Sequence, residues 1–288
     1  MKPEIYQPLV SILMTAYNRE KYIGEAIESV LKSTYTNWEL IILDDCSSDK
    51  TLKIAHRYAS DDQRVRVYKN EKNLGDYPNR NQAASFATGE YLMSVDSDDK
   101  ILPKTIEQCI NLFRLYPTAN FGFYSPYYSE PKLLNPESTI RDHFFKNPLL
   151  LVGPGGSIIK TLFFRSIGGF PIKYGPANDG YYNLNAASKT DSIVLPFDLI
   201  FYRRHEGQEI NNKYGYLYNS YLYLNNALEE IDLPISKAQK VFLHNKNKRR
   251  FFVNIIKFYV TTLDFPRTRY AMKKAGFGIK DVLTALVQ

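Results

Sequence analysis

Residues 9–43 read LVSILMTAYNREKYIGEAIESVLKSTYTNWELIIL. The apolar run at 9–15 predicts a buried strand, and the run at 38–43 predicts a second one. Between them, the segment 20–32 carries apolar residues at helical spacing: Ile23, Ala26, Ile27, Val30 and Leu31. A strand–helix–strand unit of this kind predicts two parallel strands joined by a helix that covers the sheet.

The same alternation continues to about residue 125. Further strands are expected at 64–68, 90–95 and 121–125, and further helices at 49–59, 78–87 and 103–115. We therefore predict an α/β fold with a Rossmann-like, mostly parallel sheet that is flanked by helices on both faces.

The second half of the chain is less regular. The turn-rich segment 126–156 is expected to be irregular, and short helices are expected at 161–166 and 178–187. The segment 192–202 contains a proline, which predicts an edge strand. From about residue 214 the pattern is helical to the end.

Composition places the chain among globular proteins. It has 288 residues, of which 44% are hydrophobic and 23% are charged, so intrinsic disorder is excluded. Cys46 and Cys109 form neither a disulfide framework nor a CxxC metal pair, which favours a reducing compartment. The N-terminus lacks the apolar core of a secretory signal, and no apolar stretch reaches the ~20 residues of a membrane span. A cytoplasmic protein is expected.

The net charge of +7 is concentrated near the C-terminus. Residues 237–280 contain twelve Lys or Arg and a single acid, Asp264, with seven large apolar residues between the bases: Phe242, Phe251, Phe252, Ile255, Ile256, Phe258 and Tyr259. This pattern is typical of helices that lie on anionic membranes, and also of a packed helical subdomain with solvated lysines. No RNP or zinc-finger pattern supports nucleic-acid binding.

Three carboxylates, Asp96, Asp98 and Asp99, follow the strand expected at 90–95. Carboxylates this close repel one another unless a cation lies among them, and oxygen ligands suit Mg²⁺ or Mn²⁺. The alternative is a solvated acidic turn before the next helix.

Polar residues also follow the first two strands: Thr15, Tyr17 and Asn18 after the first, and Asp44 and Asp45 after the second. The carboxyl ends of parallel strands meet at one edge of a sheet, where ligands bind. An aromatic ring can stack on a base, and a carboxylate can accept hydrogen bonds from a base or a ribose. We therefore expect a nucleotide site at this edge.

Arg80, on the helix before the acidic strand, could pair with Asp96 or Asp98, or reach a phosphate. The chain has no GxxxxGK[ST] loop and no GxGxxG after its first strand, which argues against a kinase, an ATPase or a dinucleotide dehydrogenase. HExxH and GxSxG are also missing.

Ordered motifs over residues 8–206 resemble the family 2 glycosyltransferases, which have the GT-A fold. They are VSILMTAYNREKYIGEAIESVL, ELIILDDCSSDKT, the run from Asn73 to Tyr91, VDSDD, and IGGF at 167–170. The resemblance implies a GT-A domain at 1–210, with a donor half at about 1–125 and an acceptor half at about 126–210. A helical basic extension would occupy 211–288.

The resemblance also implies roles for individual residues. The nucleotide-sugar donor would contact Thr15, Ala16, Tyr17, Arg19, Asp44, Asp45, Arg80, Asp96, Ser97 and Arg204. Arg203 or Arg204 would neutralise the leaving group. A divalent metal, Mn²⁺ or Mg²⁺, would be held by Asp98, Asp96 and His205. Asp179 would be the general base, and Asn178 before it replaces the Glu that the family commonly has. Gly155, Gly156 and Asn178 would lie on the acceptor side.

The implied reaction is inverting transfer from a nucleotide-diphosphate sugar, a UDP-sugar first, to a saccharide or lipid-linked saccharide in bacterial surface-polysaccharide or lipopolysaccharide synthesis. The basic C-terminal region would contact the inner face of the plasma membrane peripherally. Two alternatives stay open. A sugar nucleotidyltransferase would usually show a glycine-rich loop, which is missing at 15–19, and an inactive sugar-nucleotide-binding module would be free to lose Asp96, Asp98 and Asp179.

Overall fold

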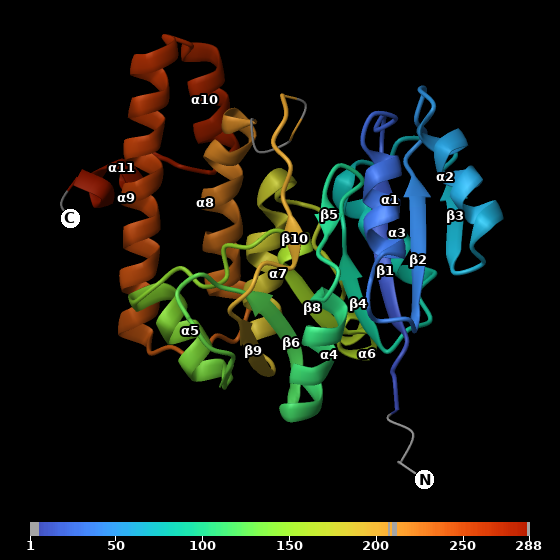
Figure 1. The fold of residues 1–288 in the computed structure, drawn as a ribbon. Helices are drawn as coiled ribbons and strands as arrows, with labels where there is room; N and C mark the ends of the chain where they lie inside the picture. Colours follow the sequence, from blue (N-terminus) through green and yellow to red (C-terminus); the bar gives the residue numbers. More distant parts are fainter. Residues whose placement is uncertain (1–5, 207, 209–211, 287–288) are drawn as a thin grey trace.

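The computed structural model describes residues 6–206, 208 and 212–286. Its centre is an eight-stranded sheet with the order β3–β2–β1–β4–β8–β6–β9–β7 (Figure 1). The strands are β1 (Val10–Ala16), β2 (Trp38–Asp44), β3 (Val65–Lys69), β4 (Tyr91–Ser94), β6 (Ala119–Tyr124), β7 (Lys132–Leu134), β8 (Ser157–Lys160) and β9 (Asp191–Leu195). β1 runs parallel to β2 and β4, β2 to β3, and β6 to β9, while β8 and β7 pair antiparallel with their neighbours.

Helices cover both faces of the sheet. One face packs against α1 (Ile23–Leu31), α2 (Thr51–Asp61) and α4 (Thr105–Leu115). The other packs against α3 (Asp76–Ser85), α5 (Pro136–Phe145), α6 (Thr161–Ser166) and α7 (Asn178–Ala187). The predicted mostly parallel sheet with helices on both faces is therefore confirmed.

Burial on both faces explains why the first strand reads as an unbroken apolar run. Ile12 and Met14 enter the core on the α1 side, together with Ile27. Leu13 points the other way and joins the core that contains Ala83 of α3. Because successive side chains of a strand alternate between its faces, a strand buried on both sides needs apolar residues at every position.

The segment 126–156 is more ordered than predicted, because it contains β7, α5 and the 3₁₀ turn η1 (Pro154–Gly156). Asn135 caps α5, since its side-chain oxygen accepts a 2.8 Å hydrogen bond from the N–H of Ser138. Pro136 occupies the first turn, where its missing N–H costs nothing. These local signals start a helix of ten residues that has little apolar periodicity.

The single edge strand predicted at 192–202 is wrong. β9 ends at Leu195, directly before Pro196, and lies inside the sheet between β6 and β7. The chain then pairs again at β10 (Ile200–Phe201), which forms a separate two-stranded sheet with β5 (Lys100–Ile101). The proline thus separates two strands of different sheets, because it cannot donate a ladder hydrogen bond.

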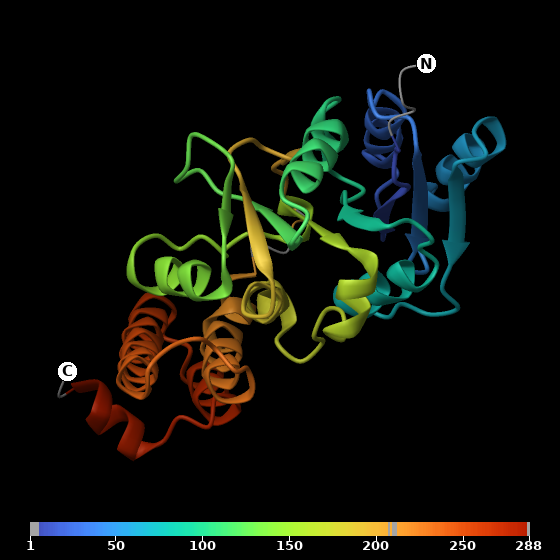
Figure 2. The ribbon, with the colours of Figure 1, turned by 90° about the horizontal axis from the view of Figure 1, so that it is seen from below.

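The C-terminal region is helical, as predicted: α8 (Lys213–Glu230), α9 (Lys237–Thr262), α10 (Phe265–Lys274) and α11 (Ile279–Leu286). These helices form a bundle beside the sheet (Figure 2) around a core of Tyr221, Phe251, Ile255, Ala271, Ala275, Phe277 and Ala285. Tyr223, Ala227 and Leu228 of α8 belong instead to the core shared with α7. The predicted boundary at 210/211 lies outside the described residues. None of the described helices is long and apolar enough to cross a bilayer.

Candidate active site at the carboxyl edge of the sheet

The ends of β1, β2 and β4 meet at one edge of the sheet. Ala16 pairs with Asp44 in the parallel register, and the N–H of Asp45 donates to the carbonyl of Ala16 at 2.7 Å. The hydroxyl of Ser97 donates to the carbonyl of Thr15 at 2.8 Å, which ties the loop after β4 to the end of β1. The structure thus brings Thr15, Ala16, Asp44 and Ser97 together at this edge. The hydroxyl of Ser97 is used in a hydrogen bond within the protein.

Left-handed residues turn the chain sharply after β1 and β2. Asn18 has φ 52° and Cys46 has φ 66°, conformations that side chains other than glycine adopt rarely. The side-chain oxygen of Asn18 accepts from the N–H of Ser48, and its own N–H donates to the hydroxyl of Ser47. The two loops therefore form one unit, and Tyr17, next to Asn18, keeps 47% of its surface exposed.

Asp44 retains an unused acceptor. One carboxylate oxygen accepts the N–H of Ser47 at 2.9 Å, while Oδ1 is buried and has no hydrogen-bond partner among the described residues. A buried, unpaired carboxylate oxygen is costly, so it is expected where a ligand supplies the donor.

Asp45 differs from its neighbour, because both of its oxygens are occupied. Oδ1 accepts from the amide of Asn70 at 2.7 Å and from the N–H of Leu74 at 2.9 Å, and Oδ2 accepts from the N–H of Gly75 at 2.9 Å. Gly75 has φ 85°, which only glycine adopts at no steric cost. In this structure Asp45 shapes the loop that leads into α3.

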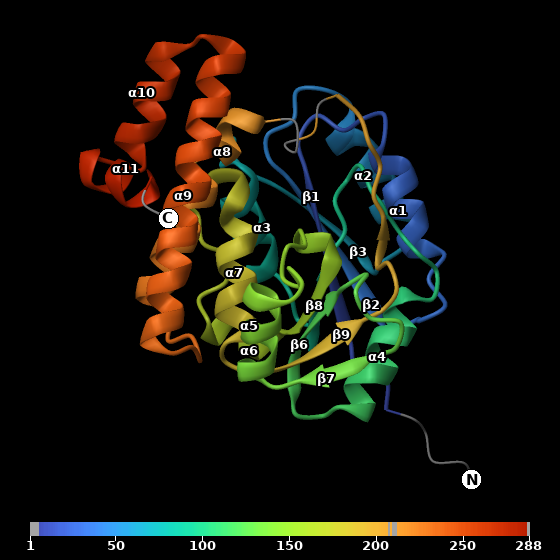
Figure 3. The same cartoon turned by 90° about the vertical axis from the view of Figure 1, so that its left-hand side faces the viewer.

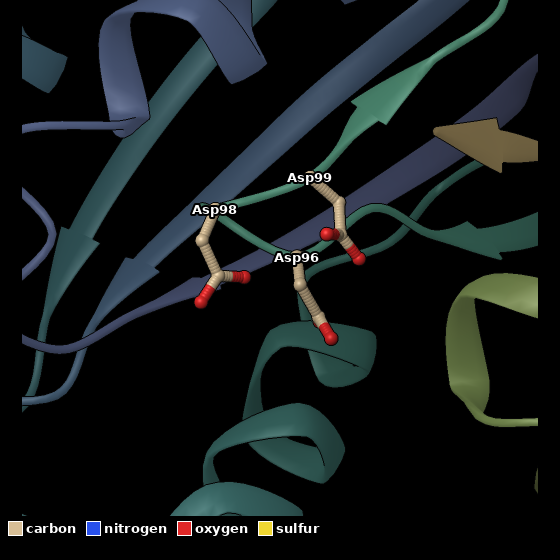
Figure 4. Close-up of side chains that lie close together, drawn as sticks. All are labelled: Asp96, Asp98 and Asp99. Atoms are coloured by element: carbon tan, nitrogen blue, oxygen red, sulfur yellow. The ribbon is translucent and has the colours of Figure 1, made fainter. Parts of the chain in front are cut away.

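Asp96, Asp98 and Asp99 form a cluster in the loop between β4 and β5 (Figure 4), with one oxygen of each within 4.8 Å of the others. Oδ2 of Asp98 lies 2.9 Å from Nε of Arg19 and 2.9 Å from Nε2 of His205. Burial raises the pKa of Asp99 to about 7, and the charges of Asp96 and Asp98 add to this, while the N–H of Arg203 opposes it. Three carboxylates with hard oxygen donors at this spacing fit Mg²⁺ or Mn²⁺.

Arg80 joins the cluster from α3. Its Nη1 lies 2.7 Å from Asp96 Oδ1, and its Nε lies 2.8 Å from Asp76 Oδ1. Burial lowers the pKa of the Arg80 guanidinium, but Asp76 and Asp96 outweigh burial and hold the pKa well above its usual value. Arg80 is therefore a fixed positive charge, held by carboxylates on two sides.

Asp179 stands in the first turn of α7 and interacts electrostatically with Arg80. Burial raises the pKa of Asp179 to about 6; the N–H of Gly180 and the charge of Arg80 lower it, and Asp76 raises it. Burial also raises the pKa of Tyr77, with Asp179 and Asp76 as further causes, which places this phenol in the same electrostatic neighbourhood. A carboxyl group with a pKa near 6 is suited to accept a proton near neutral pH.

Arg203 clamps the segment after β10 onto the acidic loop. Its N–H donates to Asp99 Oδ1 and its Nε donates to the carbonyl of Asp98, both at 2.9 Å. One terminal nitrogen contacts Glu25 at 2.9 Å, and the guanidinium lies 5.1 Å from the ring centre of Tyr22. The backbone N–H and the guanidinium of Arg203 are therefore engaged in contacts within the protein.

Arg204 and His205 follow on the same segment. Arg204 is exposed, and the ring of His205 stacks on Tyr22 with centroids 4.8 Å apart. His205 already hydrogen-bonds one carboxylate of the cluster, so it lies where a metal ligand is needed. Its role as a ligand stays a prediction.

The three residues assigned to the acceptor side have different surroundings. A Cβ on Gly155 would lie 2.6 Å from Ile200 Cδ1, and one on Gly156 would lie 3.1 Å from the Cβ of Val152. The side chain of Asn178 accepts from the N–H of Tyr174 and donates to the carbonyl of Gly175, so it holds the turn before α7.

Sequence reasoning missed two residues of this neighbourhood. Asp76 lies four positions before Arg80 on α3, and this i,i+4 spacing of opposite charges is a signal that the sequence carries. The pKa of Tyr202 is raised by burial and then by the charges of Asp99, Asp98 and Asp96, which places this residue in the electrostatic neighbourhood of the acidic cluster. No local pattern predicts this, because it depends on the pairing of β10 with β5.

Comparison with known sequences follows the same ordered motifs. The sequence profile of the family described as Glycosyl transferase family 2 matches residues 11–166, more than half of the chain. The "Putative teichuronic acid biosynthesis glycosyltransferase TuaG" of Bacillus subtilis is 35% identical over 152 residues, which cover 50% of this chain and 60% of that protein. The "Putative colanic acid biosynthesis glycosyl transferase WcaA" of Escherichia coli is 40% identical over 99 residues, 34% of this chain and 36% of that protein. The chain thus spans less than two thirds of these curated relatives.

Solved structures share the fold over nearly the whole chain. Residues 1–349 of Staphylococcus aureus TarS, in complex with UDP-GlcNAc, superpose with a TM-score of 0.74 at 22% identity, covering 92% of this chain and 80% of that one. The mannosyltransferase PcManGT of Pyrobaculum calidifontis, in complex with GDP-Man and Mn²⁺, superposes with a TM-score of 0.65 at 16% identity, covering 98% and 84%. These structures show the fold, and the match of the family profile over more than half of the chain shows that the chain belongs to glycosyl transferase family 2.

Proposed function

We propose that this protein transfers a sugar, with inversion at the anomeric carbon, from a UDP-sugar to a hydroxyl group of a saccharide or lipid-linked saccharide. The product would be a bacterial surface polysaccharide. Two observations on relatives support this choice: the names of TuaG and WcaA specify teichuronic and colanic acid biosynthesis, and TarS was solved with UDP-GlcNAc.

The edge formed by β1 and β2 would bind the nucleotide. Oδ1 of Asp44 would accept a hydrogen bond from the base, because it is buried and has no partner among the described residues. The exposed ring of Tyr17 would stack on that base, and Thr15 and Ala16 would line the floor at the end of β1. Asp45 would act by shaping the loop before α3, since its own oxygens are occupied.

The diphosphate would lie near the acidic cluster. Asp98 and Asp96, with His205 beside them, would hold Mn²⁺ or Mg²⁺, which supplies positive charge against the nucleoside diphosphate leaving group. Arg19, Arg80 and Arg204 would add fixed positive charge around the same group.

Asp179 would remove the proton from the acceptor hydroxyl as the sugar is transferred. Its pKa of about 6 leaves most of it ionised at neutral pH while keeping it basic enough to accept a proton. Attack by this hydroxyl on the face opposite the leaving group inverts the anomeric centre, so an α-linked donor would give a β-linked product. Gly155, Gly156 and Asn178 would shape the acceptor side.

A single observation carries the proposal: Arg80 contacts Asp96 of the acidic cluster and interacts with Asp179. The groups that would stabilise the leaving group and the group that would accept the proton are therefore both influenced by the charge of the buried Arg80. The catalytic domain would span 1–210, and the region 211–288 would serve a cytoplasmic enzyme as a peripheral membrane contact.

Calorimetric titration of UDP, GDP and dTDP, each with and without Mn²⁺, tests the donor class. We expect UDP to bind tightly only with Mn²⁺, and Asp98→Ala to remove that binding. Metal-independent binding, or unchanged binding by Asp98→Ala, would refute the role of the cluster. Tighter binding of GDP or dTDP would replace the UDP assignment.

A further inference from the structure

Helix α9 has apolar residues on two opposite faces. The inner face buries Phe251 and Ile255 in the bundle core and Leu243 in the core shared with α7. The outer face carries Val253, Ile256 and Val260, three and four positions apart, which puts them on one line along the helix.

The outer line continues into the turn before α10. Five consecutive members are between 46% and 76% exposed: Val253, Ile256, Val260, Leu263 and Phe265. A helix that packs on one side only normally has polar residues on the opposite side. A clustered set of exposed large apolar side chains indicates a surface that another body covers. We call this set, together with the bases beside it, the α9 outer face.

The charge of the α9 outer face has one sign. Lys246 and Lys257 lie on it, exposed, and α9 contains no Asp or Glu in its 26 residues. Arg269 is exposed on α10. Asp264, in the turn between α9 and α10, caps α10 by accepting the N–H of Arg267 at 2.9 Å.

We propose that the α9 outer face docks on an anionic lipid bilayer, with Val260, Leu263 and Phe265 inserted and the bases against the headgroups. An anionic surface with an apolar interior satisfies both features of this face. A second copy placed on it by a two-fold axis would bring bases against bases. A nucleic acid would leave the apolar line uncovered.

The orientation matches the proposed function. The turn between α9 and α10 lies toward the same end of the molecule as the carboxyl ends of β1 and β2 (Figures 1 and 3). Docking by this turn would direct the open edge of the sheet toward the bilayer, where a lipid-linked acceptor presents its hydroxyl. The choice of acceptor rests on the proposed function, whereas the docking surface rests on α9 alone.

Co-sedimentation with vesicles tests the docking. The probes are phosphatidylcholine vesicles with and without phosphatidylglycerol, and the full chain is used. We expect binding only to the vesicles with phosphatidylglycerol, and weaker binding as salt is raised. The charge variant Lys246→Gln, Lys257→Gln, Arg269→Gln should bind roughly a hundredfold more weakly, because each base near an anionic surface contributes about fivefold.

The apolar variant Val253→Ser, Ile256→Ser, Val260→Ser should also lose binding by tenfold or more, since each buried methylene contributes about fourfold. Matched controls remove three exposed apolar or three exposed basic residues elsewhere on the surface. Leu115→Ser, Leu162→Ser, Ile172→Ser is the apolar control, and Lys53→Gln, Lys104→Gln, Lys189→Gln is the charge control. Both controls should bind vesicles like the wild type.

Calorimetry with UDP and Mn²⁺ on the same samples separates the two proposals. Lost vesicle binding with intact UDP binding supports the docking face, and vesicle binding by a protein that binds no nucleotide refutes only the proposed function. Equal binding to neutral vesicles, or unchanged binding by either variant, overturns the docking proposal. So does a dimer that the apolar variant dissociates in light scattering, or RNA binding that the charge variant removes.

Discussion

The guanidinium of Arg80 lies 2.7 Å from the carboxylate of Asp96, although one residue is on α3 and the other is in the loop after β4. The same guanidinium lowers the pKa of Asp179, which stands in the first turn of α7. Three separate elements thus place charged groups around one buried cation. The rate of sugar transfer should therefore depend on pH and on the individual charged residues around Arg80.

The transfer rate is expected to fall as the pH drops through about 6. Below this value Asp179 is protonated, because burial raises its pKa, and a protonated carboxyl cannot accept the proton of the acceptor hydroxyl. Initial rates between pH 5 and 8 measure this limb. A rate that stays constant down to pH 5 would contradict the assignment of Asp179.

Asp76→Asn is expected to move this acid limb to lower pH. The charge of Asp76 raises the pKa of Asp179, and Asp76 also holds Nε of Arg80 at 2.8 Å, so its loss leaves Arg80 with Asp96 as its carboxylate contact and strengthens the effect of Arg80 on Asp179. The measurement is the pH profile of the rate. Asp61→Asn, at the exposed end of α2, is the control that should leave the profile in place.

Asp179→Asn is expected to stabilise the protein near pH 7 by about 2–3 kcal/mol, since the ionised carboxyl is penalised by burial. The folded pKa of about 6 exceeds the unfolded value, so the native state binds more protons and the free energy of unfolding falls as pH rises from about 4 to about 6. Urea unfolding at pH 5 and pH 7.5 should show this fall in the wild type and a smaller one in the variant. An equal fall in the free energy of unfolding of the wild type and the variant would mean that the pKa of Asp179 is the same in the folded and unfolded states.

Asp44→Asn is expected to weaken UDP binding by about tenfold or more, because it removes a charged acceptor from the base. Its neighbour gives a contrasting result. Asp45→Asn should lower the free energy of unfolding by about 1–3 kcal/mol, since both oxygens of Asp45 accept hydrogen bonds from the loop before α3. Calorimetry and urea unfolding on both variants distinguish the roles, and the opposite pattern would exchange the two assignments.

Gly155→Ala is expected to destabilise the protein by about 1 kcal/mol, because the new Cβ would lie 2.6 Å from Ile200 Cδ1 and this terminal methyl would have to leave its rotamer. Gly153→Ala is the matched control in the same segment, since a Cβ there meets nothing within 4 Å. Urea unfolding compares the two. Equal urea midpoints for the two variants would show that the contact between the new Cβ and Ile200 is relieved without loss of stability.

Periodicity predicted much of the α/β half of the fold because elements such as β1, β2, α1 and α4 bury a regular apolar pattern. It failed for β7 and α5, whose short segments depend on local capping by Asn135 and on pairing with β9. Pro196 marks the end of β9 in the sequence, but the pairing of β9 with β6 and of β10 with β5 depends on distant strands that no local pattern records.

In the candidate site, too, some features could be predicted from the sequence and others could not. The acids after β4 could be found because a parallel sheet gathers strand ends at one edge. Asp44 and Asp45 are the same residue type side by side, so their different hydrogen bonds follow only from the folded loops. The sequence also does not show which apolar residues of the C-terminal region are buried. Phe251 and Ile256 are both large and apolar, and only the packing of α9 buries the first and exposes the second.

The central claim is that Asp179 accepts the proton of the acceptor hydroxyl at a donor site that does not include it. The most direct test is the rate of sugar transfer by Asp179→Asn, with UDP-sugar binding measured on the same sample. We predict a loss of about a thousandfold in rate with donor affinity close to that of the wild type. Transfer by Asp179→Asn at a rate near the wild-type value would contradict the account.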